Sequence, residues 1–135
     1  MKEVYILTVT GSEWLSLNDR GHWGRRNRLT EEWRVNTGWA ARSTGTFAAR
    51  GRNKPLFERI HVIAVMLVAN NRIRDPHNFT LTAKACVDGL VDVGVVKDDS
   101  AKYLDGPDMR LRVKPGVRMP TLELHVTPIH EGTTT

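Results

Sequence analysis

The feature that most constrains the fold is an apolar run near the middle of the 135-residue chain. Between Ile60 and Ala69 the residues at both odd and even positions are largely apolar. Successive side chains of a β-strand point to opposite faces of its sheet, so this run predicts a central strand covered on at least one face. Asp75-Pro76 then ends the extended segment, because proline disfavours helical conformation in the residue before it.

Three other segments have the composition of strands. Val4 to Thr10 is rich in β-branched and aromatic residues. Tyr103 to Val113 and Met119 to Pro128 follow later in the chain, and the second of these alternates apolar with polar residues, which predicts one solvated face. The link between them contains Pro115-Gly116, a pair that favours a hairpin turn.

Two segments have helical spacing. The first begins at Thr30, a good N-cap followed by acidic residues, and extends to about Ala48. We expect its two tryptophans, Trp33 and Trp39, to lie in the core. The second runs from His77 to Val93. A chain of this length suits one domain, so we expect a single domain of residues 1–130 and a disordered tail at 131–135.

The composition favours an anionic partner. The net charge is +5 and the pI is about 9.8, which points first to nucleic acid.

Cys86 is the one cysteine, so an internal disulfide and a cysteine-based zinc site are excluded, and its apolar surroundings predict a buried thiol. The apolar stretches are too short for a signal peptide or a membrane span, and we therefore expect a cytoplasmic protein without a membrane partner.

The polar segment from Gly11 to Arg28 has two interpretations. In the first, its arginines clamp phosphates and Trp23 stacks on a base, so the segment is a nucleic-acid contact. In the second, it is a solvated loop with Trp23 tucked into the core. The two are compatible, and the sequence does not choose between them. The candidate DNA-binding residues of this segment are Arg20, Arg25, Arg26 and Arg28.

Acidic residues flank the second helix on both sides. Asp75 sits where the central strand should end, and Asp98-Asp99 follows the helix. If the helix packs back on its own strand, we expect these carboxylates to meet and to bind Mg²⁺, which takes oxygen ligands. The alternative is that Asp98-Asp99 is only a turn signal that caps the next element.

Cations and a polar stripe accompany these carboxylates. Lys84 and Asp88 are four residues apart, and His77 lies seven residues before Lys84, so the three form one helical stripe that begins beside Asp75. Lys84 would steady a phosphate or the charge that develops on it. Two further arginines would hold neighbouring phosphates, namely Arg72 and Arg74.

This central segment resembles the RusA family of Holliday junction resolvases, small dimeric endonucleases common in bacteriophages. The resemblance is carried by RIRDPHN at residues 72–78, by the helical Lys84-Ala85 and Asp88-Gly89-Leu90, and by GVVKDD at residues 94–99. It implies an α/β (α+β) fold with a mixed β-sheet of about four strands and two main helices. It also implies a homodimer that binds four-way DNA junctions by shape and nicks two opposed strands symmetrically.

The resemblance also assigns roles to single residues. Asp75 takes the place of the family's first catalytic aspartate, Asp99 that of its third, and Lys84 that of its catalytic lysine. Mg²⁺ is the implied cofactor, with Asp98 as a further metal ligand and no small-molecule cofactor. Supporting positions are Asn78 and Asp88.

The chain departs from the family pattern at two points. The second family aspartate falls on His77, and about three extra residues lie between Asn78 and Lys84. His77 either ligates a metal or transfers a proton, or it weakens magnesium binding, because imidazole suits Mn²⁺ and other transition ions better than Mg²⁺.

Three functions are therefore open. The first is a Mg²⁺- or Mn²⁺-dependent resolvase, and the second is a branched-DNA-binding protein with weak or no cleavage because His77 replaces an aspartate. The third is an enzyme acting on small phosphorylated substrates, which predicts DNA binding that is weak and insensitive to salt.

Overall fold

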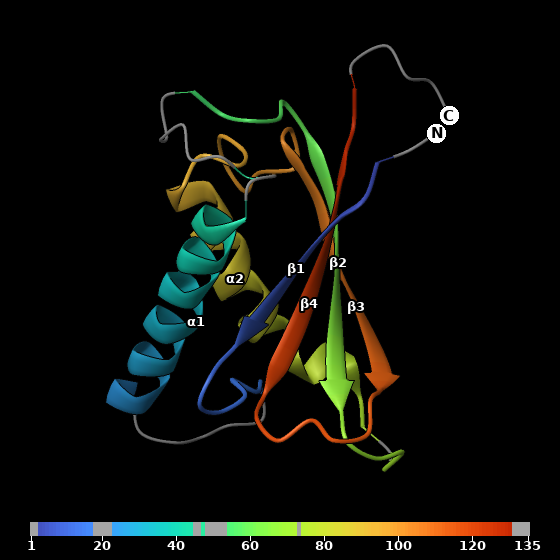
Figure 1. Cartoon of the computed structure of the whole chain (residues 1–135). Coiled ribbons are helices and arrows are strands. Elements are labelled where there is room, and N and C mark those ends of the chain that lie inside the picture. Colours follow the sequence, from blue (N-terminus) through green and yellow to red (C-terminus); the bar gives the residue numbers. More distant parts are fainter. Residues whose placement is uncertain (1–2, 18–22, 45–46, 48–53, 73, 131–135) are drawn as a thin grey trace.

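A four-stranded sheet and two helices form two layers, with both helices on one face of the sheet (Figure 1). The computed structural model describes residues 3–17, 23–44, 47, 54–72 and 74–130. The predicted sheet of about four strands with two main helices is confirmed. In chain order the elements are β1 (Tyr5–Thr10), α1 (Trp23–Ser43), β2 (Ile60–Val68), the 3-10 helix η2 (Pro76–Phe79), α2 (Thr80–Asp92), β3 (Leu104–Val113) and β4 (Thr121–Pro128).

The sheet is mixed, in the order β1-β4-β2-β3. Strand β2 is interior, as predicted, and pairs antiparallel with β4 and parallel with β3. Parallel neighbours need a crossover, which η2 and α2 provide. Helix α2 therefore runs in the direction opposite to β2 and β3 (Figure 1).

The hairpin predicted between the last two strands is wrong. Strands β3 and β4 lie on either side of β2 and do not pair with each other. Pro115-Gly116 does form a turn, in which Gly116 has a φ of +92° and the Val117 amide donates to the Lys114 carbonyl at 3.3 Å. The chain uses this turn to pass the end of β2, where the Lys114 amide donates to the Val68 carbonyl at 2.7 Å.

Helix α1 begins earlier and ends earlier than predicted. It spans Trp23–Ser43 rather than Thr30 to about Ala48. Thr30 is not the N-cap: it lies inside the helix, where its hydroxyl donates to the Arg26 carbonyl at 2.8 Å. The expected loop therefore stops before Trp23, and three of the four candidate arginines lie on the first turns of α1.

Contacts with the segment after β1 hold the first half of α1. The Trp33 indole donates to the Glu13 carbonyl at 2.9 Å, and the Ser12 amide donates to the Glu32 carboxylate at 2.5 Å. Arg25 forms an ion pair with Glu13. These contacts are tertiary, so the residue pattern of α1 did not reveal them.

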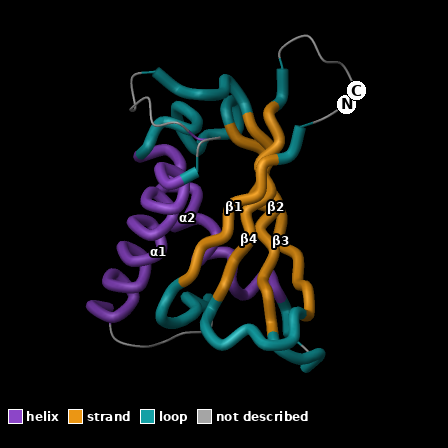
Figure 2. The backbone as a smooth tube through the Cα atoms, viewed as in Figure 1, coloured by secondary structure: helices purple, strands orange, loops and turns teal. Residues whose placement is uncertain are grey.

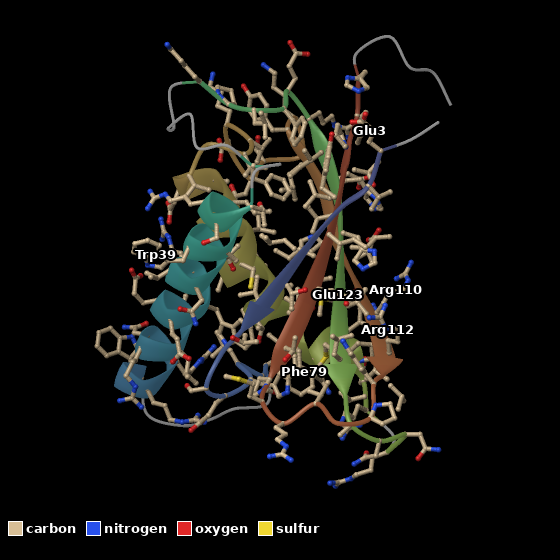
Figure 3. The ribbon with its side chains drawn as sticks, viewed as in Figure 1. Glu3, Trp39, Phe79, Arg110, Arg112 and Glu123 are labelled. Carbon is tan, nitrogen blue, oxygen red and sulfur yellow. The ribbon has the colours of Figure 1, made fainter. Side chains whose placement is uncertain are left out.

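The core lies between the sheet and the helices, and the tryptophans of α1 differ in how far they are buried in it. Trp33 is fully buried, as predicted, whereas Trp39 is 63% exposed and points away from the sheet (Figure 3). The predicted core position of Trp39 is therefore wrong. Trp23 is 77% exposed, which also rules out the interpretation that tucks it into the core. Cys86 is buried as predicted, and burial raises the pKa of its thiol to about 12.

Both helices lie on one side of the sheet (Figure 2), but the opposite face is not uniformly solvated. Glu123 of β4, expected on a wet face, is only 9% exposed. Its carboxylate accepts hydrogen bonds from Arg112 at 2.7 Å and pairs with His125 at 2.9 Å (Figure 3). Neighbouring side chains of the same face thus cover the expected wet position.

Two expectations fall outside the described residues, namely the tail at 131–135 and the DNA contact of Arg20. Among the residues that the structure describes, no helix is long and apolar enough to cross a membrane.

Candidate functional site

The two acidic segments lie at opposite ends of β2. Val68 ends β2 beside Val113, and Asp75 follows this end. Ile60 begins β2 beside Leu104, and Asp99 comes five residues before Leu104 in the chain. Helix α2 connects the two ends, and its 13 residues, which rise about 1.5 Å each, separate them by about 20 Å.

One copy of the chain therefore does not bring Asp75 to Asp98-Asp99. The physical reason is the crossover. A helix that joins two parallel strands returns the chain to the start of the first strand, and not to its end. Since Mg²⁺ binds oxygen at about 2.0–2.1 Å, one ion cannot contact both segments of the same copy.

At the beginning of α2, Asp75 and His77 form an exposed pair. The Asp75 carboxylate caps η2 by accepting from the His77 amide at 3.0 Å, and the His77 ring lies 3.3 Å from the same oxygen. The Asn78 carbonyl accepts from the Leu17 amide at 2.7 Å, which ties this corner to the segment after β1.

The arginines before this corner differ. The Arg74 guanidinium donates to the carbonyls of Asn70 and Arg72 at 3.1 and 3.3 Å, so it shapes the loop after β2. The Arg72 side chain is exposed. Of the two, Arg72 is better placed to meet a phosphate.

At the other end of α2, two carboxylates lie near each other. Burial raises the pKa of Asp88, the positive charge of Arg34 opposes this, and the negative charge of Asp99 adds to it. Asp98 accepts a hydrogen bond from the Asp99 amide at 2.7 Å, and both are exposed. This bond matches the turn interpretation and leaves the Asp99 carboxylate facing solvent.

A pocket of about 410 Å³ opens between α1 and α2. Three residues that the sequence singled out in separate segments meet in it: Arg26 of α1, and Lys84 and Asp88 of α2. Trp23 stands at its rim. The remaining lining residues are Leu15, Asn27, Thr30, Leu81 and Ala85.

The packing of α2 explains why these two charges reach the pocket. Most of the helix is buried between the sheet and α1, and Lys84 and Asp88 emerge one turn apart along its open edge. Gly89 lets the two helices approach closely, because a Cβ atom there would lie 2.3 Å from the Arg34 carbonyl oxygen. Arg34 itself is held by Asp92 through bonds of 2.5 and 2.7 Å.

Sequence reasoning missed two polar residues of the pocket, Asn27 and Thr30. A signal for them exists in the chain. Trp23, Arg26, Asn27 and Thr30 have the spacing i, i+3, i+4, i+7, which places them on one face of a helix. The signal was lost because the helix was predicted to begin only at Thr30.

The candidate metal ligands form two small groups and not one cluster. Within the described ranges, no group of three or more His, Cys, Asp or Glu side chains is arranged to hold a metal ion. Asp75 with His77 lies at one end of α2, and Asp99 with Asp88 at the other. Magnesium commonly takes one or two carboxylates and completes its shell with phosphate and water, so the oxygen donors of either group suit it.

No protein-family model matches the chain, and comparison with curated proteins finds no match either. The resemblance to the RusA family therefore rests on the residues between Arg72 and Asp99 themselves.

Proposed function

We propose that the protein is a metal-dependent endonuclease of four-way DNA junctions, as the RusA-like residues imply, and that it acts in the cytoplasm as a homodimer. One observation carries the proposal: Arg26, Lys84 and Asp88 converge in one pocket, with Asp99 near enough to raise the pKa of Asp88. Cations facing carboxylates are what a metal-dependent phosphodiesterase requires.

The residues divide the work as follows. Lys84 and Arg26 bind the phosphate on the two sides of the pocket and neutralise the charge that grows on it. Asp99, with Asp98 and Asp88 near it, and Asp75, with His77 beside it, supply the metal donors. A bound Mg²⁺ or Mn²⁺ would polarise the phosphate and lower the pKa of an attacking water. Arg28 and Arg72 extend the phosphate contacts on either side.

The separation of Asp75 from Asp99 bears on the dimer. A two-fold axis perpendicular to α2 sets the beginning of one helix beside the end of its partner. Each metal site then takes Asp75 and His77 from one copy and Asp99 from the other. Two such sites per dimer account for paired nicks in opposed strands.

The test uses a synthetic four-way junction, with linear duplex as the control, in Mg²⁺ and then in Mn²⁺. We expect paired nicks from the wild type only. Asp75→Asn and Asp99→Asn should each lower the cleavage rate by at least about a hundredfold while junction affinity is kept, since the loss of a residue that only supports a metal ligand already costs about 10–100-fold. Loss of affinity together with cleavage in a folded variant would make these aspartates structural.

Mixing the two variants decides how the site is assembled. If Asp75 and Asp99 of different copies share a site, a mixed dimer of Asp75→Asn with Asp99→Asn contains one intact site and nicks one strand. If each site lies within one copy, both sites of the mixed dimer are damaged and the mixture stays inactive. The readout is single-strand nicking after the two variants are unfolded and refolded together.

A second function is favoured by one observation, the position of His77. Its ring faces the Asp75 carboxylate where the family has another carboxylate, which reduces the negative charge available to Mg²⁺. The second candidate is therefore a branched-DNA-binding protein with weak or no cleavage. Tight junction binding without nicks in either metal would establish it in place of the endonuclease.

A further inference from the structure

We propose that the pocket between α1 and α2 binds one unpaired nucleotide of a DNA strand, with its base stacked on Trp23 and its phosphate between Arg26 and Lys84. The inference rests on the nucleic-acid part of the proposed function, and its test measures binding without cleavage.

The size and lining of the pocket suit a nucleotide. Its volume of about 410 Å³ falls in the range of small-ligand sites, roughly 300–1,000 Å³. Leu15, Leu81 and Ala85 give it an apolar wall, and polar groups line the rest. A nucleotide has the same division, because the faces of its base are apolar while its edges and phosphate are polar.

Trp23 has the exposure of a stacking platform. Trp14 and Trp33 stack on each other in the interior with ring centroids 5.5 Å apart, whereas Trp23 is 77% exposed at the rim of the pocket. A large apolar ring left in water is unfavourable unless something covers it. A base can do so, and its stacking on an aromatic side chain does not depend on sequence.

The cations reach the pocket from both helices. Arg26 projects from the first turns of α1 and Lys84 from α2, so a phosphate between them meets both charges. The first turn of α1 contains no acidic residue, and the positive end of the helix dipole adds to the same field. The guanidinium can bind two phosphate oxygens while the ammonium acts as a point charge.

Hydrogen-bonding groups beside the stacked position select the edge of the base. The Asn27 amide both donates and accepts, and the Asp88 carboxylate accepts. A carboxylate suits the exocyclic amine of cytosine, which thymine lacks. The edge is free for these contacts only in an unpaired base, so the pocket discriminates against intact duplex.

The surroundings favour a nucleotide within a strand over a free mononucleotide. Arg28 is exposed on the same helix beyond the pocket, and the whole chain has a net charge of +5. A strand carries further phosphates that this positive charge attracts, and a mononucleotide has none.

The experiment compares the two exposed tryptophans of α1 with metal removed by EDTA. Trp39 is the matched control, because it lies on the same helix, is 63% exposed and does not line the pocket. ¹⁵N-labelled protein is titrated with a 12-nucleotide oligo-dC. The indole N–H signal of Trp23 should shift and saturate while that of Trp39 stays in place.

Trp23→Ala should weaken binding about tenfold, which corresponds to the lower part of the range for one base stack. Trp23→Phe keeps an aromatic ring and should retain most of the affinity, and Trp39→Ala should leave it unchanged.

Several results would overturn the inference. Equal losses for Trp23→Ala and Trp39→Ala would indicate only general attraction to the helix. Equal affinity for oligo-dC and dCMP would make the pocket a site for free nucleotides. Equal affinity for duplex would remove the need for an unpaired base. Since the readout is binding in EDTA, failure of junction cleavage leaves this inference standing. If Trp23→Ala changes neither junction cleavage nor oligo-dC binding, the nucleotide is not stacked on Trp23, and the endonuclease proposal is unaffected.

Discussion

Glu123 is a buried charge that the sheet stabilises locally. Burial by itself raises the pKa of this carboxyl, but hydrogen bonds from His125 and Arg112 outweigh burial and hold the pKa below its ordinary value of 4.5. The ionised form is therefore the one that the fold prefers. Because the pKa is lower in the folded chain than in the unfolded chain, this contribution to stability is present above about pH 4.5 and is lost as the pH falls through the lowered value.

Glu123→Gln should consequently destabilise the fold in a pH-dependent way. At pH 7 the expected loss in the free energy of unfolding is about 1.5–3 kcal/mol, the usual size for hydrogen bonds to a charged group. The loss should shrink as the pH falls from 4.5 through the lowered pKa, because the wild-type carboxyl becomes neutral first in the unfolded chain and then in the folded chain. Urea unfolding at pH 7 and pH 3.5 measures it, with the exposed Glu58→Gln as the control. A loss of the same size at both pH values would mean that shape and not charge is responsible.

At the same scale, the sequence indicated which residues carry charge to the site better than it indicated which are buried. Lys84 and Asp88 were identified from helical spacing and do share a pocket. Trp33 and Trp39 looked alike in sequence, yet one is buried and the other exposed. Six residues correspond to 600° at 100° per residue, so the two side chains cannot share a face of one helix. Which face is covered depends on the partner element, and the pattern of α1 does not contain that information.

Among the elements, the contact between α1 and α2 depends on glycine at one position. Gly89→Ala should destabilise the fold by about 1–3 kcal/mol, the usual cost of overpacking, because its Cβ would lie 2.3 Å from the Arg34 carbonyl oxygen and 2.9 Å from the Thr37 Cβ. Gly38→Ala is the matched control on the facing helix. Its Cβ would meet a movable Val93 methyl at 3.3 Å, so the gain in helix propensity of up to about 1 kcal/mol should make the change neutral or stabilising. Thermal unfolding of the two variants compares them, and equal effects would refute the close approach at Gly89.

Elements with a strong period were predictable, and those held by tertiary contacts were not. Strand β2 is a continuous apolar run and helix α2 has a clear helical period, and their predicted positions agree with the structure to within a few residues. The first two turns of α1 contain Gly24 and a run of arginines and have little apolar pattern. These turns are held by contacts such as the ion pair of Arg25 with Glu13. Glu13 lies outside the helix, so the residue pattern of the helix does not contain this contact. Without those turns the pocket could not be predicted.

For the whole molecule, the topology depended on one connection. The segment order strand, helix, strand was predicted, but the partners of β2 were not. Joining β2 to β3 in parallel puts Asp75 and Asp99 at opposite ends of α2, and it leaves the other side of β2 to β4. The sequence shows only that Asp75 and Asp99 are 24 residues apart. The direction of the crossover, which the sequence pattern does not contain, separates them in one copy, and the proposed site therefore takes residues from a second copy.

The charge of the whole chain gives the last prediction. If six phosphates are neutralised on binding, the affinity for a junction should fall with salt with a log–log slope of roughly −5, at about −0.9 for each phosphate. Arg28→Gln should reduce the steepness of that slope by about 0.9 and weaken binding to all DNA sequences alike, because a phosphate contact carries no base information. Lys54→Gln is the control, since it removes the same charge from an exposed position outside the proposed contacts.

Fluorescence anisotropy between about 50 and about 300 mM NaCl measures the slopes. Equal changes in the two variants would show that net charge alone attracts DNA, whereas a nearly flat slope in the wild type would favour a small phosphorylated substrate over nucleic acid.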